Sequence, residues 1–293
     1  MNEDIPITAV VTETAPQLVG PAGATDCHMH FYGTREDYPL APTCPFPPPY
    51  APVAAYRGLM ARLGLERVVI VQPSAYGTDN RCTLDALAEF GAAARAVVVV
   101  DESVTDAELE RLTGLGACGI RFFMLPGGVL PWSSLETMAA RVAPFGWHVQ
   151  MQLDGRELPE HEAVLMRLPV PLVIDHTGKF LEPVAPDHPA FRSLLNLVEG
   201  GNSWVKLSAP YETSRYGPPL YGDVGTLAKA LIRAAPERML WASNWPHPSA
   251  RDDPPDDAVL LDLLLDWAED ESSRRRILTD NPAEFYGFPA NPP

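Results

Sequence analysis

The sequence has few basic residues and no hydrophobic run long enough to cross a membrane. Lys and Arg number 22 against 38 Asp and Glu, so the formal net charge of the 293 residues is −16. Nucleic acids and anionic membranes are bound by basic surfaces, and this charge argues against both as partners. No apolar run approaches the roughly 20 residues of a membrane span. Segment 1–16 also lacks the basic and apolar regions of a signal peptide.

Cysteine is scarce as well. Cys27, Cys44, Cys82 and Cys118 are far apart and form no C-x-x-C pair. This spacing matches neither a zinc motif nor a disulfide framework, and it indicates reduced thiols in a cytoplasmic protein. A Gly-rich phosphate-binding turn is missing after the first strand-like segment, which argues against a doubly wound nucleotide-binding sheet.

Proline, in contrast, is abundant. The 32 prolines make up about 11% of the chain, against a usual share of about 5%. Together with 21 glycines they reach about 18%, below the roughly 25–30% that is typical of low-complexity chains. A hydrophobic share of 46% is normal for a globular protein. We therefore expect the prolines in ordered loops, above all in segment 38–52, which follows the first strand.

Short β-branched segments alternate with amphipathic segments along the chain. Strands are indicated at 24–30, 67–72, 96–101, 118–123, 148–153, 172–175, 203–207 and 239–243. Helical periodicity is found at 54–63, 83–94, 106–113, 133–143, 160–167, 191–198, 224–233 and 256–267. This alternation predicts an α/β fold in which a parallel sheet closes into a (β/α)8 TIM barrel. We expect residues 1–20 to form an N-terminal arm and residues 21–293 to form one barrel domain.

Polar residues at the carboxyl ends of barrel strands face the active site. The candidates are His28, His30, Ser74, Tyr76, Arg121, Gln152, His176, Tyr211 and Asn244. His28 and His30 share one side of the first strand because alternate residues point the same way. Two imidazoles in one cavity suit a metal, an oxyanion or a substrate hydroxyl. Arg121 on a buried strand suits a carboxylate, which belongs either to a substrate or to an internal salt bridge.

Several segments resemble the amidohydrolase superfamily. They are 26–30, 69–74 with 77–80, 119–122, 173–178, 206–208, 241–248 and 281–286, and the resemblance extends over about residues 20–288. These segments are most similar to the lactone-acting branch, which includes pyrone-dicarboxylate hydrolases, sugar-acid lactonases and, nearest of all, isomerases of galactarolactone. The resemblance implies a TIM barrel and an enzyme of aldaric-acid breakdown. Its substrate would be a small anionic sugar-acid lactone.

Two departures from the superfamily pattern bear on the chemistry. Many members bind metal through a carboxylated Lys or a Glu on the fourth strand and a His on the fifth, where this sequence has Arg121 and Gln152. We therefore expect no catalytic metal and no cofactor. The general-base Asp of the eighth strand is Asn244 here, and an amide cannot accept a proton at neutral pH. Either the chain is an engineered, inactivated variant, as the intact surrounding motif favours, or another base serves.

The resemblance also implies roles. An Asp at position 244 would deprotonate water or a substrate hydroxyl, while His28, His30 and His176 stabilise the oxyanion. Ser74, Tyr76, Arg121, Gln152 and Tyr211 would bind the substrate. Attack by the substrate's own hydroxyl makes a metal-independent isomerase of the 1,5- to 1,4-lactone type, and attack by water makes a lactone hydrolase. A barrel that binds a sugar acid without catalysis is the third alternative. One firm cation, Arg121, favours a sugar-acid lactone over a pyrone dicarboxylate.

Overall fold

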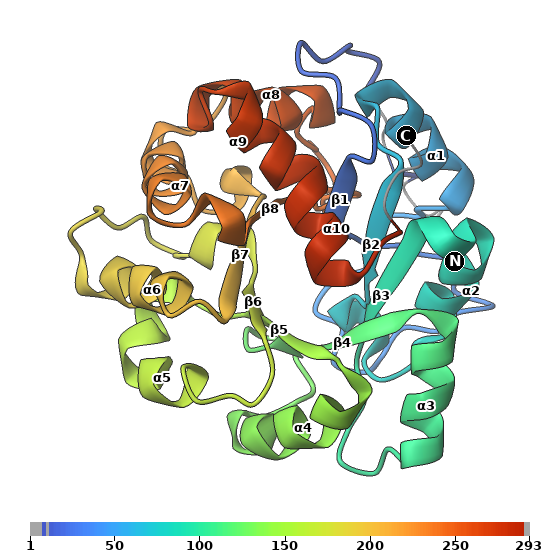
Figure 1. Cartoon of the computed structure of the whole chain (residues 1–293). Coiled ribbons are helices and arrows are strands. Elements are labelled where there is room, and N and C mark those ends of the chain that lie inside the picture. The colour runs from blue at the N-terminus through green and yellow to red at the C-terminus, as the bar shows by residue number, and fades with distance from the viewer. Residues whose placement is uncertain (1–7, 10–11, 290–293) are drawn as a thin grey trace.

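The computed structural model describes residues 8–9 and 12–289. Eight parallel strands form one sheet in the order of the sequence. They are β1 (Thr25–Met29), β2 (Arg67–Val71), β3 (Ala94–Val98), β4 (Ala117–Phe123), β5 (His148–Gln152), β6 (Leu172–Ile174), β7 (Ser203–Leu207) and β8 (Met239–Trp241). The sheet curls into a nearly closed barrel with helices around it (Figure 1), which confirms the predicted (β/α)8 fold.

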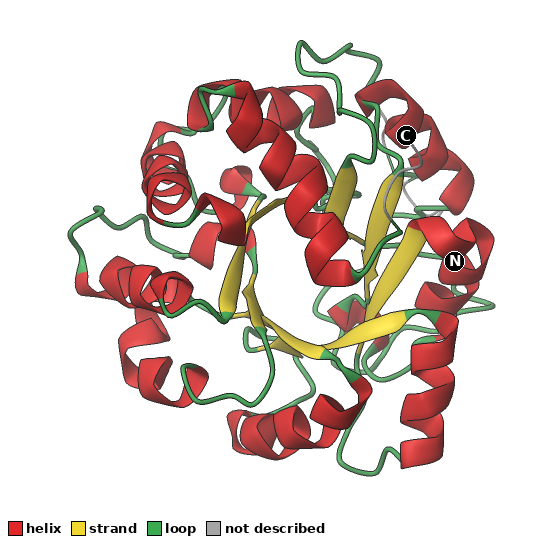
Figure 2. Ribbon diagram, in the orientation of Figure 1, coloured by secondary structure: helices red, strands yellow, loops and turns green. Residues whose placement is uncertain are grey.

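Helices cover the outside of the barrel (Figure 2). They are α1 (Val53–Leu63), α2 (Arg81–Phe90), α3 (Asp106–Leu115), α4 (Leu135–Val142), α5 (Leu158–Leu165), α6 (Pro189–Glu199), α7 (Gly222–Ala234) and α8 (Asp257–Trp267). The described chain continues with α9 (Glu271–Arg275) and α10 (Asn281–Tyr286), which are too short to give a periodic pattern in the sequence.

The predicted boundaries differ most around α2 and β3. Segment 83–94 is predicted to be helical, but α2 ends at Phe90 because Gly91 adopts a positive φ of 55°. β3 then begins at Ala94, two residues before the predicted strand. β3 also ends earlier than predicted, since its last ladder pair is Val98 with Ile120. Val99 and Val100 follow this pair and are still buried, so their apolar side chains extend the predicted strand too far. Burial therefore extends past the strand, and an apolar run overstates its length.

Hydrogen bonds just beyond β8 join the two edges of the sheet. The backbone N–H of Asn244 donates to the carbonyl of His28 at 2.9 Å, and the N–H of His30 donates to the carbonyl of Trp245 at 2.8 Å. These bonds close the barrel on the side of β1. They also place residue 244 directly beside the histidine pair of β1.

The segment around α10 closes the barrel at the amino ends of its strands, the end that faces the viewer in Figure 1. Tyr286 and Phe288 belong to one buried cluster with apolar side chains of the barrel strands, among them Val69, Val97, Val173 and Leu240. The Arg95 side chain of β3 donates to the carbonyls of Tyr286 at 3.0 Å and Gly287 at 2.6 Å. We call this apolar layer around Tyr286 and Phe288 the floor of the barrel. A polar cavity can therefore open at the opposite end, where the strands have their carboxyl ends.

The described part of the expected N-terminal arm packs against α8 and its N-terminus. Thr12 donates through Oγ1 to Oδ1 of Asp256 at 2.7 Å, and the N–H of Leu18 donates to Oδ1 of Asp262 at 2.8 Å. Residues 1–7 and 10–11 of this arm lie outside the described residues. No helix in the described ranges is long and apolar enough to span a membrane. The four cysteines are all free thiols.

Candidate active site

A cavity of about 140 Å³ opens at the carboxyl ends of the strands. Its wall includes six of the residues expected from the sequence: His30, Ser74, Arg121, Gln152, His176 and Asn244. Pro45, Phe46 and Pro48 from the proline-rich segment 38–52 form another part of the wall. Because proline fixes its own φ, this part of the wall is stiff.

Strained backbone gathers where β6, β7 and β8 end. Seven non-glycine residues of the described chain have positive φ, and six of them follow these three strands: His176, Thr177, Lys179, Ala209, Asn244 and His247. Each left-handed residue of this kind costs roughly 1–2 kcal/mol. Such strain is typical of functional sites. Here the turns bring His176, Lys179 and Asn244 to the cavity wall.

Three histidines meet at the base of the cavity and in the layer just beneath it. Nε2 of His28 lies 3.3 Å from Nε2 of His30, and the rings of His28 and His176 are 4.8 Å apart between centroids. His30 Nδ1 donates to the carbonyl of Val71 at 2.7 Å, so its Nε2 is an acceptor in the neutral ring. Burial lowers the pKa of His30 to about 3 and lowers the pKa values of His28 and His176 well below the ordinary value. All three imidazoles are therefore neutral at neutral pH.

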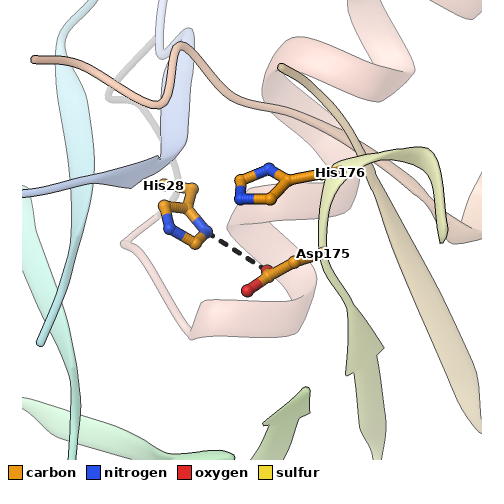
Figure 3. A group of neighbouring side chains, drawn as sticks. All are labelled: His28, Asp175 and His176. Carbon is orange, nitrogen blue, oxygen red and sulfur yellow. Dashed lines mark hydrogen bonds and ion pairs between the residues drawn. The ribbon is translucent and has the colours of Figure 1, made fainter. Parts of the chain in front are cut away.

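A fully buried polar layer supports these histidines. Asp175 lies below both imidazoles in Figure 3, and its Oδ1 is 3.2 Å from Nδ1 of His28. Lys206 donates to Oε1 of Gln150 at 2.6 Å and lies 3.6 Å from Oδ1 of Asp175. Burial lowers the pKa of Lys206, and the Asp175 carboxylate acts in the opposite direction. The layer thus contains a compensated pair of charges with no exposure to solvent.

The superfamily that the sequence resembles suggests a metal at this position. Ligand atoms of His28, Asp175 and His176 do lie within 4.8 Å of one another. However, the Lys206 ammonium is 3.4 Å from Nδ1 of His28 and 3.6 Å from Oδ1 of Asp175. A divalent cation would meet a buried like charge there, where repulsion is strong. These residues therefore do not fit a divalent metal ion.

Arg121 brings a positive charge to the cavity without a carboxylate partner in the described structure. Its Nη1 donates to the carbonyl of Gln72 at 2.8 Å and its Nη2 donates to Oε1 of Gln152 at 2.9 Å, while its Nε has no hydrogen-bond partner among the described residues. The residue is 3% exposed, and burial lowers the pKa of its guanidinium. A buried cation of this kind favours an anionic ligand.

Asn244 is held by a chain of hydrogen bonds from behind the cavity wall. Its Nδ2 donates to Oη of Tyr211 at 2.8 Å, and this hydroxyl lies 3.0 Å from Nδ1 of His247. His247 Nε2 lies 3.1 Å from Oδ1 of Asp257, a carboxylate that favours the proton on Nε2. Burial raises the pKa of Tyr211 well above its ordinary value, so Tyr211 is a neutral hydroxyl. With Nδ2 engaged, Oδ1 of Asn244 is left to accept a hydrogen bond.

Three of the expected residues do not line the cavity. His28 lies in the layer beneath it, and Tyr211 lies behind Asn244. Tyr76 accepts a hydrogen bond from the N–H of Gly33 at 3.1 Å and is 3% exposed. The polar groups of these three side chains bond to other groups of the protein. Their position near a strand end in the sequence does not reveal these internal bonds.

The cavity wall also contains residues that sequence reasoning missed, namely Tyr32, Lys179, Glu212 and Ser249. Lys179 and Glu212 each lie five residues after the last residue of a strand, β6 and β7 respectively. A charged residue this close to a strand end was a usable signal. The left-handed turns that carry these side chains inward were not visible in the sequence.

These features define a class of protein: a (β/α)8 barrel with a ligand cavity at the carboxyl ends of its strands, neutral histidines at the base and an unpaired arginine on the wall. The chain belongs to the amidohydrolase family, since the family model described as Amidohydrolase matches residues 25–288. This confirms the resemblance found in the sequence.

Individual relatives match over nearly the whole chain. D-galactarolactone isomerase of Agrobacterium fabrum is 40% identical over 277 residues, which cover 93% of this chain and 94% of the relative. The 2-pyrone-4,6-dicarboxylate hydrolase of Comamonas testosteroni is 35% identical over 281 residues, 92% of each chain. An apo crystal structure of an Agrobacterium tumefaciens protein matches with a TM-score of 0.87 and 40% identity. That match covers 94% of this chain and 99% of the other.

Proposed function

We propose that this chain is a lactone-acting enzyme, and that its reaction is the metal-independent isomerisation of an aldaric-acid lactone, of the 1,5- to 1,4-lactone type. The observation that carries the proposal is Arg121, a buried cation on the cavity wall without a carboxylate partner among the described residues. Such a group suits the free carboxylate of a sugar-acid lactone. The relative at 40% identity, D-galactarolactone isomerase, supports the isomerase rather than the hydrolase.

In this reaction an acyl group moves between two hydroxyls of one substrate. A substrate hydroxyl loses its proton and attacks the lactone carbonyl, and a tetrahedral oxyanion forms. The ring oxygen then leaves and takes up a proton, so no water is consumed. His176 lines the cavity as a neutral imidazole and can donate to the oxyanion through Nε2 without a metal, because its Nδ1 can accept from the Ser208 hydroxyl 2.8 Å away. His30 also lines the cavity, and its Nε2 can accept a hydrogen bond from a substrate hydroxyl. Ser74, Gln152 and Arg121 are available for the hydroxyls and the carboxylate.

We assign the proton-accepting position to residue 244. The amide of Asn244 cannot take the proton. The chain thus carries Asn where an Asp would give the active form, as in an inactivated variant. The hydrogen bond from Nδ2 to Tyr211 supports this assignment, because it leaves one side-chain oxygen at the cavity wall. General-base catalysis typically contributes about 10²–10⁴-fold. We expect Asn244→Asp to raise the turnover of an aldaronolactone by this factor, whereas Asn244→Ser gives no gain.

NMR of the lactone forms tests the proposal with Asn244→Asp and D-galactarolactone. Formation of the second lactone before any open-chain acid supports the isomerase, and direct formation of galactarate supports the hydrolase instead. Absence of turnover of any aldaronolactone or pyrone dicarboxylate, with the acid still bound, overturns the catalytic proposal in favour of a binding protein. Loss of turnover after dialysis against a chelator overturns metal independence.

A further inference from the structure

The cavity contains a second cation besides Arg121, and this cation is already paired. The Lys179 ammonium forms an ion pair with Oε2 of Glu212, and the hydroxyl of Ser249 donates to Oε1 of the same carboxylate. Both charged side chains are only 8% exposed. Glu212 is the one carboxylate among the described residues of the cavity wall. The protein thus places a negative charge of its own inside the candidate site.

The two cations approach the cavity from different sides. Arg121 belongs to β4, whereas Lys179, Glu212 and Ser249 follow the neighbouring strands β6, β7 and β8. In a closed barrel of eight strands, β6 lies a quarter of a turn from β4, and β8 lies opposite β4. A ligand in the cavity therefore meets an unpaired guanidinium on β4 and a neutralised ion pair at a different part of the wall, after β6 and β7.

An ammonium and a hydroxyl on the two oxygens of a carboxylate form a donor set that would suit a carboxylate ligand. Here the protein supplies the carboxylate itself. We propose that Glu212 takes the place of a second substrate carboxylate and thereby restricts the site to lactones with one free carboxylate. The inference rests on the proposed lactone-acting site and specifies its substrate class. A lactone with two carboxylates would have to displace Glu212 or place its second charge beside it, where the two repel each other.

Two stable sugar acids test this selectivity without any turnover. D-galactonate and galactarate share the hydroxyls of their four central carbons and differ at one end, where galactonate has a hydroxymethyl group and galactarate has a second carboxylate. Titration calorimetry at one ionic strength gives Kd for both acids with the unmodified protein and with Glu212→Ala. We expect galactarate to gain at least about tenfold over galactonate in Glu212→Ala, because Lys179 and Ser249 are freed for its second carboxylate. Glu212→Gln keeps the side-chain volume and gives a smaller gain. If Glu212→Ala does not fold, the gain of galactarate over galactonate is measured with Glu212→Gln instead.

Two further variants control for net charge and for the source of the gain. Glu182 lies after β6, is exposed and pairs with Arg156 and Arg215 at the surface. Glu182→Gln removes one negative charge without opening the cavity, and it should leave the preference between the two acids unchanged. Lys179→Met combined with Glu212→Ala should abolish the gain, because it removes the ammonium that binds the second carboxylate. Circular dichroism and thermal unfolding establish that each variant is folded.

The outcomes separate this inference from the proposed function. If both acids bind and their relative affinity is the same in Glu212→Ala as in the unmodified protein, the inference is wrong and the proposed function stands. The same conclusion follows if Glu182→Gln shifts the preference equally, or if the shift persists in the double variant. If neither acid binds to any variant, the inference and the sugar-acid function are both wrong.

Discussion

Replacing Arg121 with methionine should weaken the binding of anions and, at the same time, stabilise the fold. Methionine has a similar length, so the packing of β4 is preserved. What disappears is a buried charge that forms no ion pair with a carboxylate in the described structure. A hydrogen bond to a charged group contributes about 1.5–3 kcal/mol. We therefore expect the Kd for galactonate to rise by about 10- to 150-fold in Arg121→Met.

The stability change is the sum of two opposing effects. Loss of the guanidinium leaves two acceptors, the Gln72 carbonyl and Oε1 of Gln152, without their donor, at about 1–3 kcal/mol each. Removal of a buried charge that forms no ion pair recovers several kcal/mol of desolvation. The side chain of Gln152 lines the cavity, where water can replace the guanidinium as a donor. The charge effect should therefore prevail, and we expect the free energy of unfolding to rise by about 0.5–2 kcal/mol.

Arg95 provides the matched control. It is also a barrel-strand arginine, but its guanidinium is bound to backbone carbonyls of residues 286 and 287 at the floor. Arg95→Met should lower the free energy of unfolding and leave galactonate binding unchanged. Urea unfolding and titration calorimetry measure both quantities. If Arg121→Met is destabilised as strongly as Arg95→Met and binds galactonate normally, then Arg121 is structural and our reasoning about an unpaired buried charge fails.

Two further predictions concern the fold. Burial lowers the pKa of His30 to about 3 in the folded protein. Between about pH 6.5 and pH 3 this imidazole is therefore protonated in the unfolded chain but not in the folded one. The free energy of unfolding should fall as the pH is lowered through this window. Asp26, with a pKa raised to about 6, opposes this trend between about pH 4 and 6, but His28 and His176, whose pKa values burial lowers well below the ordinary value, reinforce it. Urea unfolding at stepped pH should show the slope, and His30→Gln should reduce it; a flat or inverted dependence would contradict the prediction. Gly178→Ala should cost about 1–3 kcal/mol more than the control Gly146→Ala. Both glycines have positive φ, but a Cβ at Gly178 would lie 2.6 Å from a ring carbon of Phe180, whereas one at Gly146 meets nothing within 4 Å. Equal urea midpoints for the two variants would show that the contact relaxes freely.

The barrel could be predicted from the sequence because parallel strands covered by helices read as short apolar runs. Arg67–Val71 and Ser203–Leu207 are examples in which predicted and observed strands overlap closely. The ends of β3 could not be predicted in the same way, since Val99 and Val100 remain buried beyond the hydrogen-bonded ladder. Burial and strand pairing are different properties, and composition reports only the first.

The cavity residues at strand ends could be predicted for a similar reason, since a polar side chain there has few places to point other than the cavity. The depth of each side chain in the barrel could not be predicted. His28, for example, lies one layer below the cavity wall, beside Asp175. The support of Asn244 was also invisible, because Tyr211, His247 and Asp257 come together only through the turns after β7 and β8. Pairs so far apart in the chain leave no local pattern.

The floor formed by Tyr286 and Phe288 bears on the order of events during synthesis. These residues leave the ribosome after all eight strands have been made. Until they arrive, the interior side chains of Val69 and Leu240 lack their apolar cover, and the guanidinium of Arg95 lacks its carbonyl partners. The nascent barrel therefore remains open at this end, with exposed apolar surface of the kind that chaperones bind. Closure of this end therefore depends on α10.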